Sequence, residues 1–287
     1  MPTPFSICRR RVLLALGALS LSVARLAGAQ QDVEEKRTGG PYVPTPQVVV
    51  DEMLRIGRVG PNDFVIDLGS GDGVIVLTAA QKLKARGFGV DIDPELVSRS
   101  NAEAKKRGIS DRAEFHVQDV FKTDVSKATV VTLYLLPGMM LNLRPKLFNE
   151  LKPGTRIVSH DYHFDDWASD EQRTWDVPEK EKINGVPRAT VYVWIVPAKI
   201  AGRWQLKTDT GEQFELALRQ QFQTFSGVDA RGGKLTNTLL RGDEIAFALP
   251  VPVNRQFKGR VTGDSMTGVV ELGGGKTAGW TATRSKA

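Results

Sequence analysis

The sequence predicts an α/β fold with an open parallel sheet, followed by a small antiparallel β-barrel or sandwich. Three observations lead to this prediction. Short apolar runs alternate with amphipathic stretches over residues 41–197. A glycine-rich turn follows the first apolar run, at the place where such a sheet holds its ligand. The last 90 residues contain 13 of the 28 glycines and repeat short alternating runs, which predicts a β-rich domain over residues 198–287.

The composition is that of a folded protein with one or two domains. The chain has 287 residues, 41% of them hydrophobic, and a formal net charge of +6. That charge is uneven, because residues 1–29 contain four arginines and no acid, whereas residues 30–197 contain 22 basic and 25 acidic residues. The bulk charge therefore gives no strong signal for nucleic-acid binding. Cys8 is the one cysteine, which excludes a disulfide scaffold.

The N-terminus is typical of a signal peptide. Three arginines, residues 9–11, precede an apolar run at residues 12–24 and a small-residue site at residues 27–29. The run is shorter than the roughly 20 residues that span a bilayer. We therefore expect cleavage after residue 29, export to a periplasmic or extracytoplasmic space, and no transmembrane span in the mature chain. A flexible polar leader follows at residues 30–40. The alternative is an N-terminal membrane tether.

The α/β part, residues 41–197, begins with an extended segment, a helix and a buried strand. Prolines at Pro41, Pro44 and Pro46 favour an extended backbone. Apolar side chains on one side of residues 47–57 predict a helix. The short apolar run at residues 64–68 is typical of a strand that is buried on both faces.

The next feature is the turn Asp67-Leu68-Gly69-Ser70-Gly71-Asp72-Gly73, which leads into a predicted helix over residues 74–84. Its glycines let the backbone turn tightly and let a ligand approach the amides at the helix N-terminus. The spacing is one residue shorter than in the turn that seats a pyrophosphate, and the carboxylate of Asp67 would repel one. This disfavours a nicotinamide-dependent oxidoreductase. The same carboxylate could accept a hydrogen bond from the ammonium group of an amino-acid-bearing nucleoside.

Three carboxylates are predicted at one edge of the sheet. Asp67 ends the first strand, Asp91 ends a strand at residues 87–90, and Asp119 follows a strand at residues 113–117. Because ligands of open α/β sheets bind beyond the carboxyl ends of the strands, one nucleoside could meet all three. We expect Asp91 to hold the ribose hydroxyls and Asp119 to accept from the adenine amine.

The second half of the α/β part supplies a fourth strand at residues 128–136, a fifth at residues 156–159 and a closing antiparallel strand at residues 190–196. Between the last two lies a polar, acidic stretch at residues 163–188, interpreted as a lid or an ordinary solvated connection. In the last domain eight short strands are expected, at residues 203–207, 213–220, 222–227, 235–241, 244–249, 256–262, 266–272 and 280–283.

These motifs resemble the class I S-adenosylmethionine-dependent methyltransferases over residues 41–197. Residues 41–44, residues 67–73 and the stretch Pro137-Gly138-Met139-Met140 with Leu143, Lys146 and Leu147 are similar to the ATP-synthase c-subunit lysine methyltransferase family. The leading segment and residues 156–159 are more distantly similar to the non-SET histone lysine methyltransferases. The resemblance implies a Rossmann-like seven-stranded methyltransferase sheet and S-adenosylmethionine as cofactor. The expected cofactor-binding residues are Tyr42, Thr45, Asp67, Gly69, Ser70, Gly71, Gly73, Asp91, Ile92, Asp119 and Val120.

For the acceptor side, the candidate catalytic residues are Tyr134, at the end of the fourth strand, and Asp161 and His163, just beyond the fifth. No Asn-Pro-Pro-Tyr sequence is present, which counts against a DNA or amide acceptor, and the three histidines have no metal-ligand spacing. We therefore predict methyl transfer to a protein lysine. Because export would separate the enzyme from its cofactor, the alternative is an exported, non-enzymatic protein that binds a nucleoside or a partner. The oligomeric state stays open.

Overall fold

A computed structural model describes residues 40–249 and 255–285. The predicted signal peptide, and the leader up to residue 39, lie outside the described residues. The described residues contain a mixed sheet with helices and a separate antiparallel sheet, so the predicted α/β fold followed by a small antiparallel β domain is confirmed.

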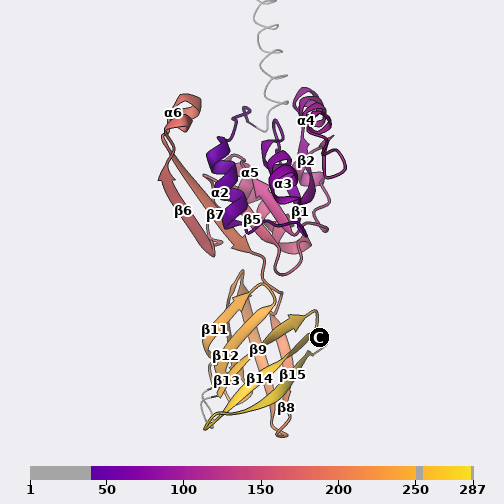
Figure 1. Ribbon diagram of the computed structural model, residues 1–287. Helices are drawn as coiled ribbons and strands as arrows, with labels where there is room; N and C mark the ends of the chain where they lie inside the picture. The colour runs from indigo at the N-terminus through magenta and orange to yellow at the C-terminus, as the bar shows by residue number, and fades with distance from the viewer. Residues whose placement is uncertain (1–39, 250–254, 286–287) are drawn as a thin grey trace, which may run out of the picture. The chain divides into compact units, whose positions relative to one another are not determined.

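The mixed sheet has seven strands in the order β3-β2-β1-β4-β5-β7-β6 (Figure 1). Strands β1 to β5 run parallel, and β7 is antiparallel to both β5 and β6. The elements are α2 (Gln47–Ile56), β1 (Phe64–Leu68), α3 (Val74–Leu83), β2 (Arg86–Asp91), α4 (Pro94–Lys106), β3 (Ala113–Val117), the 3-10 helix η1 (Val120–Lys122), β4 (Val130–Leu133), α5 (Pro137–Glu150), β5 (Arg156–His160), β6 (Glu171–Asp176), α6 (Pro178–Asn184) and β7 (Arg188–Ile195).

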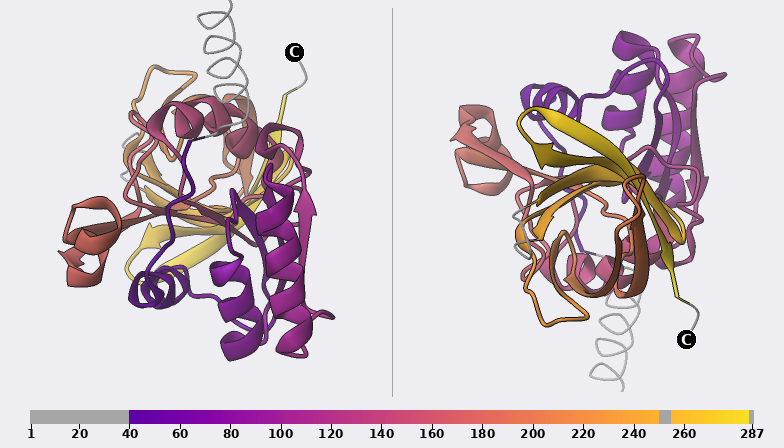
Figure 2. Two further views of the ribbon diagram at one scale, coloured as in Figure 1. Left: turned by 90° about the horizontal axis from the view of Figure 1, so that it is seen from above. Right: turned by 90° about the horizontal axis from the view of Figure 1, so that it is seen from below.

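Two apolar layers hold this sheet between helices. One layer joins the buried faces of α2, α3 and α4 to the sheet, and the other joins α5 to the opposite face (Figure 2). β1 is an interior strand between β2 and β4, with Val65, Ile66 and Leu68 fully buried. A strand covered on both faces has to be apolar on both, which is why this segment is apolar in the sequence except at Asp67.

Two stretches of the chain differ from the sequence prediction. β4 spans Val130–Leu133 and not residues 128–136, because Pro137 starts α5 and the residues before it form the connection. The polar stretch at residues 163–188 contains β6 and α6. All but one of the β6 residues are exposed, so the strand has no apolar pattern, and its pairing with β7 defines it.

The second sheet has eight antiparallel strands in the order β10-β9-β8-β15-β14-β13-β12-β11. They are β8 (Gly202–Thr208), β9 (Gln213–Gln221), β10 (Thr224–Asp229), β11 (Thr236–Arg241), β12 (Glu244–Leu249), β13 (Arg255–Thr262), β14 (Ser265–Gly273) and β15 (Lys276–Arg284). The end strands β10 and β11 lie against each other, and Val228 forms a bridge with Lys234 beside them. The sheet is therefore close to a closed barrel around its own apolar core.

Candidate active site

The carboxyl ends of the parallel strands β1 to β5 share one edge of the mixed sheet. Leu133 of β4 pairs with Leu68 of β1 on one side and with Ser159 of β5 on the other. Tyr134 therefore stands between the glycine-rich turn and the end of β5. The strand order reverses at β1, and ligands of open α/β sheets bind at such a point.

The glycine-rich turn has a backbone that strongly favours glycine. Gly69, Gly71 and Gly73 have φ angles of +82°, +53° and +77°, in the left-handed region. The amides of Gly69 and Ser70 both donate to the carbonyl of Val90 at 2.9 Å, which ties the turn to β2. Gly73 is the N-cap of α3 and supplies no side-chain cap. The side chain of the N-cap residue therefore offers no hydrogen-bond acceptor to the backbone N–H groups in the first turn of α3.

Tyr42 lies over this turn. A Cβ atom added at Gly71 would stand 2.6 Å from the Tyr42 ring. Burial and the neighbouring Asp72 raise the pKa of the Tyr42 phenol, so it stays neutral at physiological pH. Thr45 is in the same extended segment and is partly exposed. The leading segment thus packs against the turn through Tyr42, whose ring lies where a side chain at Gly71 would otherwise be.

Asp67 lies beneath the turn. Its side chain belongs to β1, the residue is 2% exposed, and Oδ1 accepts a hydrogen bond of 2.6 Å from the Thr132 hydroxyl. Burial raises the pKa of this carboxyl to about 7, and the charges of Asp91 and Asp72 act in the same direction. The sequence places Asp67 at the rim with the other two carboxylates, whereas the structure puts it under the backbone that a ligand would touch.

Asp91 and Asp119 are at the ends of β2 and β3. Asp91 accepts hydrogen bonds from the amides of Gly71, at 2.9 Å, and Asp93, at 3.0 Å. Asp119 caps η1 by accepting from the amide of Phe121 at 2.9 Å. Both carboxylates are partly exposed. Asp91 therefore both holds the glycine-rich turn and presents oxygen at the edge of the sheet.

Apolar side chains are exposed beside these two carboxylates. Ile92 is 46% exposed and Phe121 is 40% exposed, whereas Val120 is buried in the core. Ser70 is buried, and its hydroxyl has no hydrogen-bond partner among the described residues. An apolar surface next to carboxylate oxygen is what a nucleoside requires, because the base needs a wall for its face and the sugar hydroxyls need acceptors.

These residues fit S-adenosylmethionine. The ribose hydroxyls would meet Asp91, the adenine would lie between Ile92 and η1, whose N-cap is Asp119, and the amino-acid portion would meet the glycine-rich turn at residues 69–73. We call the glycine-rich turn the cradle. Its glycines allow close packing, since a Cβ atom added at Gly69 would clash with the Leu135 side chain at 2.6 Å. Gly71 thus contacts both Tyr42 and Asp91, whereas Asp67 and Val120 are buried.

The acceptor side is a cluster of aromatic and charged residues next to this cradle. The ring of Tyr134 lies 4.0 Å from the ring of His160 and 6.1 Å from that of Tyr162. His160 is fully buried, and burial lowers its pKa to about 4, so the imidazole is neutral. Burial, with the charge of Asp161 second, raises the pKa of Tyr134 to about 12. The cluster therefore presents two neutral rings beside one carboxylate.

Asp161 is held firmly in this cluster. Its amide donates to the carbonyl of Thr190 at 2.6 Å, and its Oδ1 accepts from the amide of Thr190 at 3.0 Å. Its φ angle is +62°, a left-handed conformation that is uncommon for residues other than glycine. The remaining oxygen, Oδ2, faces His160 Nε2 at 3.5 Å and forms an ion pair with Lys180.

Two residues of this cluster were missed by sequence reasoning, and one predicted residue does not share its contacts. Lys180 and Asn184 of α6 contact Asp161 and Tyr134, from a stretch that sequence alone interpreted as a polar lid or connection. A lysine four residues before an asparagine on one helix face was the only available signal. His163 is exposed, accepts from the Asp165 amide at 3.0 Å and packs against Tyr192.

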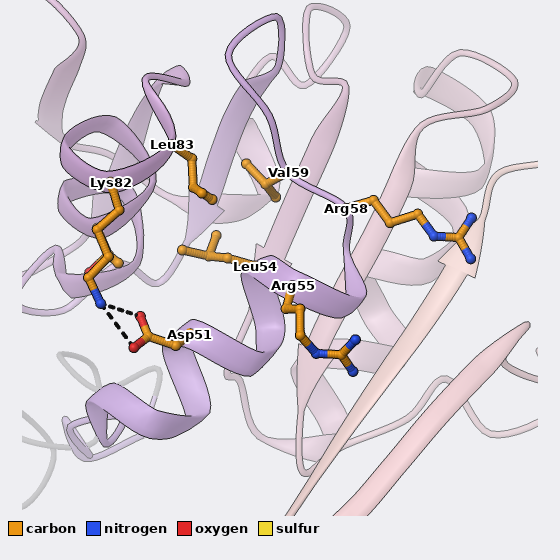
Figure 3. Close-up of a pocket in the computed structure, with 8 residues that line it drawn as sticks. Asp51, Leu54, Arg55, Arg58, Val59, Lys82 and Leu83 are labelled. Atoms are coloured by element: carbon orange, nitrogen blue, oxygen red, sulfur yellow. Dashed lines mark hydrogen bonds and ion pairs between the residues drawn. The ribbon is translucent and has the colours of Figure 1, made fainter.

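A separate hollow of about 490 Å³ lies between α2 and α3 (Figure 3). Leu54, Val59 and Leu83 form its apolar wall, and Lys82 pairs with Asp51 at 2.8 Å across it. Lys82 and Leu83 end α3, whereas the glycine-rich turn precedes that helix. The hollow is therefore distinct from the candidate active site.

Comparison with known proteins gives consistent relatives. A family model described as the ANTKMT methyltransferase domain matches residues 67–171. A curated protein-lysine N-methyltransferase of Saccharolobus islandicus is 42% identical over 158 residues, which are 54% of this chain and 93% of that protein. The human ATP-synthase c-subunit lysine N-methyltransferase is 33% identical over 133 residues, 45% of this chain and 55% of that protein. The chain thus spans about half the length of the ATP-synthase-modifying enzymes that it matches.

A solved structure adds one further relative. It is described as an RNA methyltransferase from Salinibacter ruber in complex with S-adenosyl-L-homocysteine. Its sequence is 48% identical, the match covers 55% of this chain and 96% of that chain, and the TM-score is 0.49.

Proposed function

Because the chain belongs to the family of S-adenosylmethionine-dependent protein-lysine methyltransferases, we propose that it transfers a methyl group to the side-chain amine of a lysine in another protein. The observation that supports this acceptor is the position of Tyr134. Tyr134 directly follows β4, and β4 lies between β1, which leads into the glycine-rich turn, and β5, which ends just before Asp161. The cradle for the cofactor and the acceptor cluster are therefore neighbours at one edge of the sheet.

The residues of the chain have distinct roles in this proposal. When bound, S-adenosylmethionine supplies a methyl group on a positively charged sulfur. Asp91 holds the ribose, and the turn at Gly69–Gly73 fixes the amino-acid portion. Tyr134 forms a neutral aromatic wall beside the acceptor amine, with the buried ring of His160 packed against it, and Asp161 accepts a hydrogen bond from the amine. Positioning and exclusion of water then supply most of the acceleration, since the amine attacks directly.

A binding measurement tests the cofactor half. We expect calorimetry to detect binding of S-adenosylmethionine and S-adenosylhomocysteine, and no comparable binding of NAD. Asp91→Ala should weaken that binding by about 1–3 kcal/mol, because the ribose hydroxyls lose their acceptor and the Gly71 amide loses a partner. Asp111→Ala, on the surface after α4, is the matched control. Equal affinity of Asp91→Ala and the unaltered protein would remove Asp91 from the site.

A turnover measurement tests the acceptor half. The protein is incubated with methyl-labelled S-adenosylmethionine and either a pool of lysine-containing peptides, the same pool with its lysines acetylated, or RNA. The proposal requires label in the first pool and none in the second. RNA is included because the Salinibacter ruber relative is described as an RNA methyltransferase. Label in RNA alone, or cofactor binding without turnover on any acceptor, would contradict a lysine acceptor.

A further inference from the structure

Lys180 is a buried lysine at the acceptor cluster. It is 2% exposed, its Nζ donates to the carbonyl of Arg188 at 2.5 Å, and it forms an ion pair with Asp161. α6 carries it there together with Asn184, whose amide lies 3.4 Å from the Tyr134 hydroxyl. Residues four apart share a helix face, so one face of α6 reaches both the carboxylate and the phenol.

Two further titratable groups at this pair, His160 and Tyr134, are uncharged near neutral pH. His160 is neutral because burial lowers its pKa to about 4, and Tyr134 because burial raises its pKa to about 12. Tyr162 stacks beyond Tyr134. The guanidinium of Arg188 faces away, toward Asp176 at 3.5 Å. Among the described residues packed against the pair, the charges at the acceptor cluster are therefore one cation and one anion.

We propose that Lys180 is a positioning residue that balances the charge of Asp161 and thereby keeps the acceptor lysine in its neutral, reactive form. This inference rests on the proposed function, because it takes the acceptor amine to lie beside Asp161. Only the neutral amine has a lone pair for the methyl group. The nitrogen–carbon bond forms as the carbon–sulfur bond breaks, the electron pair stays on sulfur, and the extra proton on nitrogen leaves to solvent.

The electrostatic reason concerns the amine before the transfer. A free lysine has a pKa of about 10.4, so almost all of it is protonated at neutral pH. A lone carboxylate beside it would favour the ammonium form further, whereas a nearby cation disfavours it. With Lys180 in place, Asp161 can still accept a hydrogen bond from the amine, but the pair as a whole does not attract the proton. Lys180 thus acts on the acceptor through Asp161.

The pH dependence of turnover tests this directly. kcat for a lysine peptide is measured between pH 7 and pH 10.5 at saturating peptide and cofactor, because kcat reports the groups in the enzyme–substrate complex. The midpoint of the rising limb is compared among variants. Lys180→Met leaves Asp161 unbalanced, so the midpoint should rise by about one pH unit or more. Asp161→Asn removes the anion but keeps the positive charge of Lys180, so this variant should lower the midpoint. The double variant has neither charge and should return close to the midpoint of the unaltered protein.

The matched control is Lys182→Met, which removes an exposed lysine from the same helix and should leave the midpoint unchanged. Calorimetry with S-adenosylhomocysteine must give the same affinity for all variants, which separates an effect on the acceptor from an effect on the cofactor site. If Lys180→Met fails to fold, the comparison of Asp161→Asn with the double variant carries the test.

Two outcomes overturn the inference. If the unaltered protein turns over lysine peptides but the midpoints of the Lys180 and Asp161 variants coincide with its own, Lys180 has a structural role only and the proposed function stands. If the unaltered protein binds the cofactor and methylates no lysine, the proposed function fails, and this inference fails with it.

Discussion

The buried carboxyl of Asp67 links the fold to pH. Its pKa of about 7 lies above the value of about 3.9 for an exposed aspartate. Between these two values the folded protein keeps a proton that the unfolded chain has released. Raising the pH through this window therefore lowers the free energy of unfolding, and above about pH 7 the loss is complete. The reason is that desolvation penalises the charged form more than the Thr132 hydrogen bond favours it.

Replacement of Asp67 by asparagine should remove this contribution. Asp67→Asn keeps an oxygen for the Thr132 hydroxyl and cannot ionise. In urea unfolding at pH 4.5 and pH 8, the variant should therefore lose less stability with rising pH than the unaltered protein, by up to a few kcal/mol. Asp111→Asn, at an exposed position after α4 and away from this turn, is the control. If the free energy of unfolding changes by the same amount between pH 4.5 and pH 8 in the Asp67 variant and in the unaltered protein, the buried carboxyl does not retain its proton.

At the scale of single elements, the sequence predicts what has a pattern and misses what depends on partners. All eight strands of the second sheet are predicted, because apolar and polar side chains alternate and glycine-containing turns separate them. β6 has no such alternation, since its residues are almost all exposed. Hydrogen bonds to β7 make it a strand, and no local property of Glu171–Asp176 announces that pairing.

The residues of the candidate site divide in the same way, into those that a sequence pattern predicts and those that only the fold brings to the site. Asp91 and Asp119 could be located because they follow apolar runs whose ends must share an edge. Lys180 reaches the site from a polar stretch, so only the fold reveals its contact with Asp161. The histidines show a further limit, because β5 extends through His160 and buries that side chain, whereas His163 lies beyond the strand and is exposed. A spacing in the sequence does not say where a strand ends to within one residue.

Trp280 is the side chain on which the second sheet depends most clearly. It is 2% exposed, its Nε1 lies 3.1 Å from the carbonyls of Lys258 and Val269, and its ring packs edge-on against Phe247 and Phe257. Trp280→Ala should lower the free energy of unfolding by about 3–5 kcal/mol, through lost packing and a residual cavity. Urea unfolding followed by circular dichroism measures it.

Two comparisons make the result for Trp280 specific. Trp280→Phe keeps part of the ring contact and should cost less than the alanine variant. Val269→Ala alters a half-exposed side chain on the neighbouring strand and should have little effect. A loss below about 1 kcal/mol for Trp280→Ala would show that the aromatic contacts do not hold the barrel together.

At the scale of the whole molecule, localisation is still a proposal from the sequence. The arginine and apolar pattern of residues 1–29 lies outside the described residues. Over residues 40–249 and 255–285, no helix combines the length and apolar character that a membrane crossing requires. We propose that the protein is exported and cleaved, with an uncleaved N-terminal tether as the alternative.

The mass of the protein recovered after expression in a bacterium tests that proposal. We expect a chain that begins at Gln30, recovered with the periplasmic or secreted fraction. A matched variant, in which Arg9, Arg10 and Arg11 are replaced by glutamine, should stay full-length inside the cell, because the positive residues before the apolar run are needed for targeting. A full-length chain in the membrane fraction would support the tether, and a full-length chain in the cytoplasm would exclude both.

The connection between β6 and β7, which contains α6, has a consequence for the evolution of the protein. The nucleoside side of the edge is built from residues before η1 ends, and the amine side from residues after β4. A swap, insertion or loss around α6 would change which amine is accommodated and would leave the contacts of Gly71 with Asp91 and Tyr42 in place. The segment that contains α6 can thus change to accept new substrates, while the segment that binds the nucleoside keeps its residues.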